Sequence, residues 1–274
     1  MSKPEIQRIA AFSDGELGGN PAGVVIGDAH PPEAEMRRIA AEVGFSETAF
    51  AARTDDGWRV RYFSPESEVP FCGHATIALG SALAQQFGDG VYALTLNDAK
   101  ITVEGGRAAV ALQSPPTRSK PASPELVAEV LALFGYCERD LDPRLPPAVI
   151  HGGADHLLIA LKTRKAIAAM QYDLDAGRTL MLREGLVTIV FAYAETPQHF
   201  HTRNAFASGG VYEDPATGAA TAALAGYLRD LAWPHGGAIE IVQGEDMGSR
   251  SRLRAEIPEE RGSSIRVSGT TRRL

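Results

Sequence analysis

An internal repeat constrains the fold of this 274-residue chain more than any other feature of its sequence. When the sequence is shifted by 145 residues, residues 68–83 align with 213–228 without a gap and share eight identities in sixteen positions. Chance pairing in Ala-rich segments explains the aligned alanines but not the aligned Glu, Pro, Gly and Thr. The repeat therefore predicts two similar lobes, and the length agrees, because about 150 residues usually make one domain.

Each copy of the repeat has the chemistry of a strand that turns tightly into a helix. Pro70 or Pro215 stops the strand, and Gly73 or Gly218 lets the backbone turn. The first amides of the helix lack intrahelical partners, so its N-terminus is suited to an anion. If the copies face each other, both helix ends aim at one cleft, and a small carboxylate is the simplest ligand.

The hydrophobic pattern predicts many strands interleaved with a few helices. We expect strands at 5–12, 22–26, 46–53, 57–64, 147–150, 156–161, 186–194, 199–206, 238–243, 252–257 and 264–268, and three more within 91–112. We expect helices at 32–44, after Gly73, at 124–135 with Ser123 as its cap, near 163–183 and at 218–231. The Pro- and Ser-rich segment 113–124 predicts a linker. The expected lobes are therefore 1–118 and 119–274, and we leave open that the last strand crosses back to the N-terminal lobe.

Composition and motifs exclude several classes of protein. With 27 basic and 34 acidic residues the formal net charge is −7, whereas nucleic-acid binding needs clustered Lys and Arg. The sequence has no apolar run of membrane-spanning length and no signal-peptide pattern, and its two cysteines make no disulfide framework. Nucleotide-binding glycine motifs are missing, and His199 and His201 lack a third ligand at metal-site spacing. We expect a cytoplasmic protein with no cofactor, no metal and no nucleic-acid or membrane partner.

Several side chains near the two turns could carry protons: Glu47, Cys72, His74, Glu213 and Asp214. Apolar residues flank Glu47, and burial favours the protonated form of a carboxyl, which suits acid–base chemistry. His74 begins a helix, where the neutral imidazole is favoured. Because Cys72 aligns with Thr217, a racemase with two facing thiols is disfavoured. Local sequence alone leaves structural roles open: Glu47 at a strand edge, His74 as a helix cap, and Asp214 in an ordinary turn.

Five motifs together point to a known family. They are GNPAGVV (19–25), FSETAF (45–50), FSPESEVPFCGHAT (63–76), EDPATGAA (213–220) and QGEDMG (243–248). In order and over nearly the whole chain, this set resembles the PhzF-like family of phenazine-biosynthesis isomerases. The resemblance implies the diaminopimelate epimerase fold, an α/β (α+β) architecture of two similar lobes. In that fold each lobe is a mixed sheet curled around a central helix, and a cleft separates the lobes.

The resemblance also implies roles for individual residues. Glu47 matches the family's proton shuttle, and His74 and Asp214 match residues that hold the substrate. The substrate-binding positions would be Asn20, Gly73, Ala75, Thr76, Gly218 and Ala219. The family's usual Ser is Ala219 here, a departure that bears on the substrate more than on the proton-transfer machinery.

The resulting expectation is a cofactor-independent, PhzF-like isomerase that moves a proton on a small anionic carboxylate. One alternative is an amino-acid racemase or epimerase on the same fold, which needs a second proton carrier such as Cys72 or Asp214. Another is a non-catalytic ligand-binding protein. A homodimer is left open.

Overall fold

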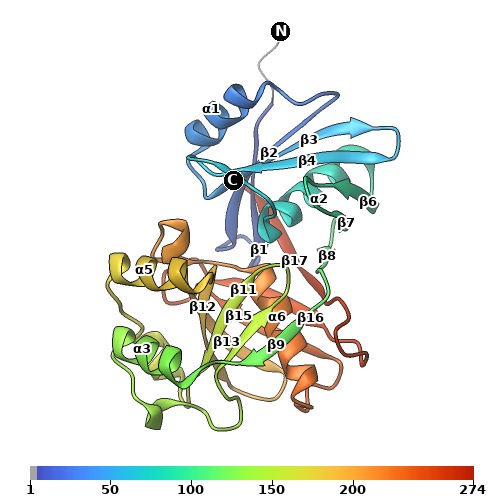
Figure 1. Ribbon diagram of the computed structural model, residues 1–274. Coiled ribbons are helices and arrows are strands. Elements are labelled where there is room, and N and C mark those ends of the chain that lie inside the picture. Colours follow the sequence, from blue (N-terminus) through green and yellow to red (C-terminus); the bar gives the residue numbers. More distant parts are fainter. Residues whose placement is uncertain (1–4) are drawn as a thin grey trace. The chain divides into compact units, whose positions relative to one another are not determined.

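The structure is a computed structural model that describes residues 5–274, and its chain divides into two compact units (Figure 1). Unit 1 contains the chain up to Gln113 together with Ser268–Leu274, and unit 2 is Ser114–Val267. The chain thus returns to unit 1 at its C-terminal end. That the units fold as separate domains stays a prediction.

Unit 1 is a mixed sheet around one central helix. Its elements are β1 (Gln7–Ser13), β2 (Asn20–Gly27), α1 (Glu33–Val43), β3 (Glu47–Thr54), β4 (Gly57–Phe63), β5 (Glu68–Val69), α2 (Gly73–Phe87), β6 (Gly90–Thr95), β7 (Lys100–Gly105), β8 (Val110–Gln113) and most of β17 (Arg266–Arg273). Strand β2 runs parallel to β3, and β4 runs parallel to β6, whereas the β1–β2, β3–β4 and β6–β7 pairs are antiparallel. Helix α2 packs against β1, β2, β3, β7 and β8, and its residues 74–84 are all buried.

Unit 2 repeats this arrangement. Its elements are β9 (Arg118–Pro121), α3 (Pro124–Phe134), a 3₁₀ turn η1 (Glu138–Asp140), β10 (Ala148–His151), β11 (Asp155–Ala160), α4 (Arg164–Ala168), α5 (Leu174–Glu184), β12 (Thr188–Ala194), β13 (His199–Ala205), a 3₁₀ turn η2 (Ala207–Gly209), β14 (Glu213–Asp214), α6 (Gly218–Asp230), β15 (Ala238–Gln243) and β16 (Ser251–Glu256). Strands β11 and β12 are parallel, as are β13 and β15, and helix α6 packs against β9, β10, β11, β15 and β16. The predicted fold of two similar lobes, each a mixed sheet around a central helix, is confirmed.

Most predicted elements are confirmed, and three details are corrected. The expected linker 113–124 contains β9, which pairs with β10. The single helix expected near 163–183 is two helices, because Thr163 caps α4 and Asp173 caps α5. The final strand extends to Arg273, well beyond the expected 264–268. No helix in residues 5–274 is long and apolar enough to cross a membrane.

Strand register extends the repeat beyond the aligned segments. In unit 1, Phe63 of β4 pairs with Glu68 of β5; in unit 2, Ala205 of β13 pairs with Glu213 of β14. The connection is 64–67 in unit 1 and the longer 206–212 in unit 2. Because the connection in unit 2 is longer, an alignment without gaps cannot align β4 with β13.

The same register matches an Arg–Glu ion pair in unit 1 with an Arg–Glu ion pair in unit 2. Arg61 lies two residues before Phe63, and its Nε and Nη2 contact Glu68 at 2.8 and 2.5 Å. Arg203 lies two residues before Ala205 and contacts Glu213 at 3.0 and 2.5 Å. Each unit therefore fixes the strand that leads into its helix turn with a bidentate ion pair.

Candidate active site

Glu47 is placed by the end of α1 and the start of β3. Helix α1 ends at Gly44, whose φ of 70° is the left-handed conformation that favours glycine. Three residues later Glu47 begins β3, where it is only 8% exposed. Its Oε2 atom is buried and has no hydrogen-bond partner among residues 5–274. The predicted burial of this carboxyl is confirmed.

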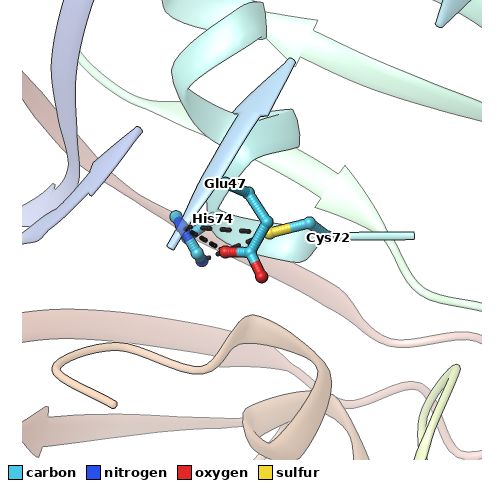
Figure 2. Close-up of side chains that lie close together, drawn as sticks. All are labelled: Glu47, Cys72 and His74. Atoms are coloured by element: carbon cyan, nitrogen blue, oxygen red, sulfur yellow. Dashed lines mark hydrogen bonds and ion pairs between the residues drawn. The ribbon is translucent and has the colours of Figure 1, made fainter. Parts of the chain in front are cut away.

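His74 lies beside Glu47 at the start of α2 (Figure 2). Its Nε2 is 3.3 Å from Glu47 Oε2 and 3.3 Å from Ser46 Oγ, and its Nδ1 is 3.3 Å from Cys72 Sγ. Cys72, His74 and Glu47 are each less than a tenth exposed. The motifs FSETAF (45–50) and FSPESEVPFCGHAT (63–76) thus meet in one buried cluster of groups that can hold protons.

A buried hydroxyl pair supports the start of α2. The Thr76 hydroxyl donates to the Cys72 carbonyl at 2.7 Å, so the Tyr62 hydroxyl, 2.6 Å away, donates to Thr76. Burial raises the pKa of Tyr62, which keeps it a neutral donor. Because the amide of Thr76 is also bonded to the Cys72 carbonyl, Thr76 supports the turn from within. Sequence reasoning did not single out Tyr62, since a Tyr on a buried strand carries no local functional signal.

The central helices of both units begin without a side-chain cap. Cys72 is the N-cap residue of α2 and Thr217 that of α6, and neither side chain accepts a hydrogen bond from its helix. The two N-caps also align in the repeat. Uncapped first amides, together with the helix dipole, make each end suited to an anionic group.

Asp214 is held in unit 2 just before α6. It is 6% exposed, and the Thr217 hydroxyl donates to its Oδ2 at 2.5 Å. The Gln243 amide group donates to the Asp214 carbonyl at 2.7 Å. Gln243 begins the QGEDMG motif, so this motif and EDPATG meet in space.

The remaining residues predicted to bind substrate lie at the starts of β2, α2 and α6 or within the first turn of a helix. Asn20 is buried at the first position of β2, Gly73 and Gly218 begin α2 and α6, and Ala75 is buried inside α2. Ala219 is the second residue of α6, which is the position of His74 in α2. The structure brings Glu47 and His74 together within unit 1. That both helix turns face one cleft stays a prediction.

The two units differ at the position of Glu47. Thr48 pairs with Phe63, and Ile189 pairs with Ala205, so the counterpart of Glu47 in unit 2 is Thr188. The counterparts of Cys72 and His74 are Thr217 and Ala219. The buried proton carriers of unit 1 are therefore replaced in unit 2 by groups that do not titrate near neutral pH.

Glu47, Cys72 and His74 are also residues of metal-ligating types. Among residues 5–274 they form the one group of three such side chains whose ligand atoms lie within 4.8 Å of one another. His199 and His201, the other histidines considered for a metal, are not part of it. Chemistry alone permits either a proton-carrying cluster or a site for an ion here.

Comparisons with solved structures define the class of fold. A PhzF-family protein of Bacillus anthracis superimposes with a TM-score of 0.88 at 22% identity, covering 100% of this chain and 98% of that one. A probable proline racemase of Agrobacterium radiobacter superimposes with a TM-score of 0.67 at 13% identity, covering 99% and 91%. The fold is thus the one shared by PhzF proteins and proline racemases.

Sequence comparison then gives the family. Residues 9–272 match the family model described as phenazine biosynthesis-like protein. The trans-2,3-dihydro-3-hydroxyanthranilate isomerase of Pseudomonas aeruginosa is 34% identical, over 95% of this chain and 94% of its own length. This chain belongs to the phenazine biosynthesis-like (PhzF) family, and its predicted class, an isomerase, is confirmed. A purely ligand-binding role is therefore not supported.

Proposed function

We propose that this enzyme moves a proton between two carbons of a small carboxylate without a cofactor, and that Glu47 carries the proton. One observation carries the proposal. A buried carboxylate oxygen without a hydrogen-bond partner lies 3.3 Å from His74, at the start of a helix without a side-chain cap. A group that takes a proton from the substrate needs a carboxylate oxygen that is not already committed to a hydrogen bond and that comes within hydrogen-bond distance of the substrate.

The reaction needs only proton movement. Glu47, as carboxylate, takes the proton from one carbon, and the C–H electron pair spreads into the adjoining unsaturated system. The now protonated Glu47 returns the proton to a second carbon, where the new C–H bond forms, and the carboxylate is restored. The first amides of α2 and α6 are proposed to bind the substrate's anionic group, because pre-oriented backbone donors stabilise charge as it develops. His74 and Asp214 are proposed to hold the substrate.

The second candidate is a racemase or epimerase that uses two proton carriers on opposite faces of one carbon. The counterparts of Glu47, Cys72 and His74 in unit 2 are Thr188, Thr217 and Ala219. This asymmetry favours a single carrier, as the isomerase requires. Asp214 is the unit 2 residue that the alternative would have to use.

Solvent-deuterium exchange distinguishes these candidates. The enzyme is incubated in D₂O with trans-2,3-dihydro-3-hydroxyanthranilate and, separately, with a panel of small amino and hydroxy acids, and products are followed by NMR. Migration of a double bond with deuterium at the receiving carbon supports the isomerase. Deuterium at an α-carbon with loss of optical activity supports the epimerase. Exchange that is lost on treatment with a chelator and restored by a divalent metal ion would overturn cofactor independence.

A cytoplasmic location and a homodimer also remain proposals. Neither is needed by the chemistry above, since the acid–base cluster lies within unit 1 of a single chain. Light scattering of the purified protein measures the oligomeric state, and cell fractionation tests the location.

A further inference from the structure

The two units can be compared position by position. A polar residue present in only one unit is not needed for the fold that both units share, so it is a candidate for a role in a site. At matched places unit 2 carries polar groups where unit 1 carries Val69, Cys72 and Leu96. These groups are Asp214, Thr217 and Gln243, which we call the polar relay.

Strand register establishes these matches. Val69 pairs with Tyr62 on β4, as Asp214 pairs with Asn204 on β13. Leu96 directly follows Thr95, the β6 residue paired with Arg59 of β4. Gln243 likewise directly follows Val242, the β15 residue paired with His201, which is the counterpart of Arg59 on β13.

The side-chain hydrogen bonds of the polar relay lead from Gln243 through the Thr217 hydroxyl to the Asp214 carboxylate. Gln243 Nε2 donates to Thr217 Oγ1 at 3.0 Å, and Thr217 Oγ1 donates to Asp214 Oδ2 at 2.5 Å. The Gln243 Oε1 atom accepts from the Thr217 amide at 3.2 Å. Since Gln243 supplies a proton to the Thr217 oxygen, the Thr217 hydroxyl hydrogen is free to point at the carboxylate. Gln243 thereby fixes both the backbone of the turn and the orientation of the Asp214 side chain.

The turn after Gln243 packs against the same segment. Gly244 has a φ of 72°, and a Cβ at this position would lie 2.7 Å from the Pro215 carbonyl oxygen. A residue with a side chain would therefore push the two turns apart. The start of QGEDMG is shaped to contact the EDPATG turn.

We propose that Gln243 is a positioning residue for the reaction: it holds the Asp214 carboxylate and the first turn of α6 in the orientation that binds substrate. This inference rests on the proposed role of Asp214 in holding the substrate. The fold itself does not require the amide, because the matched position in unit 1 is the apolar Leu96, 4% exposed. Gln243 is only 1% exposed, and its amide offsets the cost of burial by hydrogen bonds that all go to Asp214 and Thr217.

The first test needs no ligand. Gln243→Met keeps the approximate volume of the side chain and removes its hydrogen bonds. We expect amide hydrogen exchange in residues 213–219 to accelerate at least about tenfold, the loss of protection that one lost hydrogen bond of about 1.4 kcal/mol gives. Exchange in the rest of unit 2 should change little. Unchanged protection of residues 213–219 would overturn the positioning role, whatever the enzyme's reaction proves to be.

The second test compares binding with turnover. The probe for binding is 3-hydroxyanthranilate, measured by calorimetry, and turnover is the deuterium exchange described above. Gln243→Met and Thr217→Val should each raise KM more than they lower kcat, and Thr217→Ser, which keeps the hydroxyl, should restore wild-type values. Because the two residues act in one chain of hydrogen bonds, the double variant Gln243→Met/Thr217→Val should be no worse than the more affected single variant.

Thr202→Val is the matched control. Thr202 pairs with Gln243 in the β13–β15 register and is buried, and its counterpart Val60 is apolar. The Thr202→Val substitution should leave KM, kcat and the amide hydrogen exchange of residues 213–219 unchanged. Equal effects of Thr202→Val and Gln243→Met, or full additivity in the double variant, would overturn the proposal. A wild-type enzyme that neither moves a double bond nor exchanges deuterium would instead refute the proposed function, and the hydrogen-exchange result on Gln243 would still stand.

Discussion

At the scale of single residues, the proposed site is built on one buried carboxylate, that of Glu47. Glu47 Oε2 has no hydrogen-bond partner in residues 5–274, although His74 Nε2 is 3.3 Å away. A buried polar atom left in this state costs stability. The matched residue in unit 2, Thr188, is bonded to His156 at 2.8 Å, and the proposed proton transfer by Glu47 accounts for the difference.

Glu47→Gln should abolish proton exchange and leave ligand binding largely in place. Gln keeps the shape of Glu but cannot carry a proton, and a general acid–base group typically contributes about 10²–10⁴-fold in rate. Deuterium exchange and calorimetry with 3-hydroxyanthranilate measure the two properties. His74→Ala is the comparison and should weaken binding as well as turnover. Near-wild-type exchange by Glu47→Gln would move the assignment to Cys72 or Asp214.

Ala219→Ser should leave the fold intact and increase affinity for hydroxyanthranilate-like acids. Ala219 is partly exposed at the second position of α6, so a hydroxyl fits there and adds one donor at the proposed substrate site. Circular dichroism checks the fold, and calorimetry compares the affinities of the two proteins. If the affinities are equal, Ala219 does not account for a changed substrate range.

At the scale of elements, an Arg–Glu pair fixes each strand that precedes a helix turn, and the two pairs differ in burial. The Arg203 and Glu213 side chains are 8% and 2% exposed, whereas those of Arg61 and Glu68 are 20% and 21% exposed. Arg203 also donates to the carbonyls of Ala168 and Met170. The Arg203–Glu213 pair should therefore contribute differently to the free energy of unfolding from the Arg61–Glu68 pair.

Arg203→Met should destabilise the protein by about 3–5 kcal/mol, because it leaves the Glu213 carboxylate buried without its partner. Arg61→Met should cost less than Arg203→Met, since water reaches the Glu68 carboxylate and screens the loss of its partner. Urea unfolding of both variants provides the comparison, with each unit followed separately by hydrogen exchange. Equal losses would show that burial of the pair does not decide its contribution.

The Arg61–Glu68 pair also predicts a pH dependence. Hydrogen bonds from Arg61 lower the pKa of Glu68 from 4.5 to about 2. A lowered folded-state pKa gives stability that is present above the unfolded value and lost as pH falls from 4.5 towards 2. Urea midpoints measured across this window should therefore fall less steeply for Glu68→Gln than for the wild type. Parallel curves for the two proteins would contradict the assignment.

At the scale of the whole molecule, the last segment of the chain belongs to the first unit. Ser268–Leu274 is part of unit 1, where β17 pairs with β1 and the Thr271 hydroxyl lies 2.7 Å from that of Ser81 in α2. The expected linker contains β9, and the last strand runs past its expected end; its return to the first unit was left open from the sequence. Unit 1 therefore combines strands from distant parts of the described chain.

Deleting residues 268–274 should destabilise unit 1 more than unit 2. Each lost backbone hydrogen bond to β1 costs about 1 kcal/mol, and β1 is left with an unpaired edge. Hydrogen exchange followed by mass spectrometry should show faster exchange in β1 and α2, with residues 118–256 largely unchanged. Uniform loss of protection in both units would show that they unfold together.

Local signals in the sequence determined much of this protein. The 3.6-residue pattern of α1 selected the residues that are buried, Met36, Ile39, Ala40 and Val43. Ser123 caps α3 as expected, accepting from the Leu126 amide at 3.2 Å. The repeat predicted two alike units, and the apolar flanks of Glu47 predicted its burial. The helix pattern, the cap and the flanks of Glu47 depend on neighbours within a few residues, and the repeat emerges when the sequence is compared with itself. The sequence therefore displays all of them directly.

Only the tertiary structure decided which distant side chains meet. The contact of His74 with Glu47, the Tyr62–Thr76 support and the bond of Gln243 to Asp214 all join segments separated by at least one strand or turn. Neither Arg–Glu pair was predicted, and the longer connection 206–212 keeps Arg203 out of register with Arg61 in the ungapped alignment. Strand register decides all of these contacts, and register is set by packing of whole sheets against a central helix rather than by any local pattern.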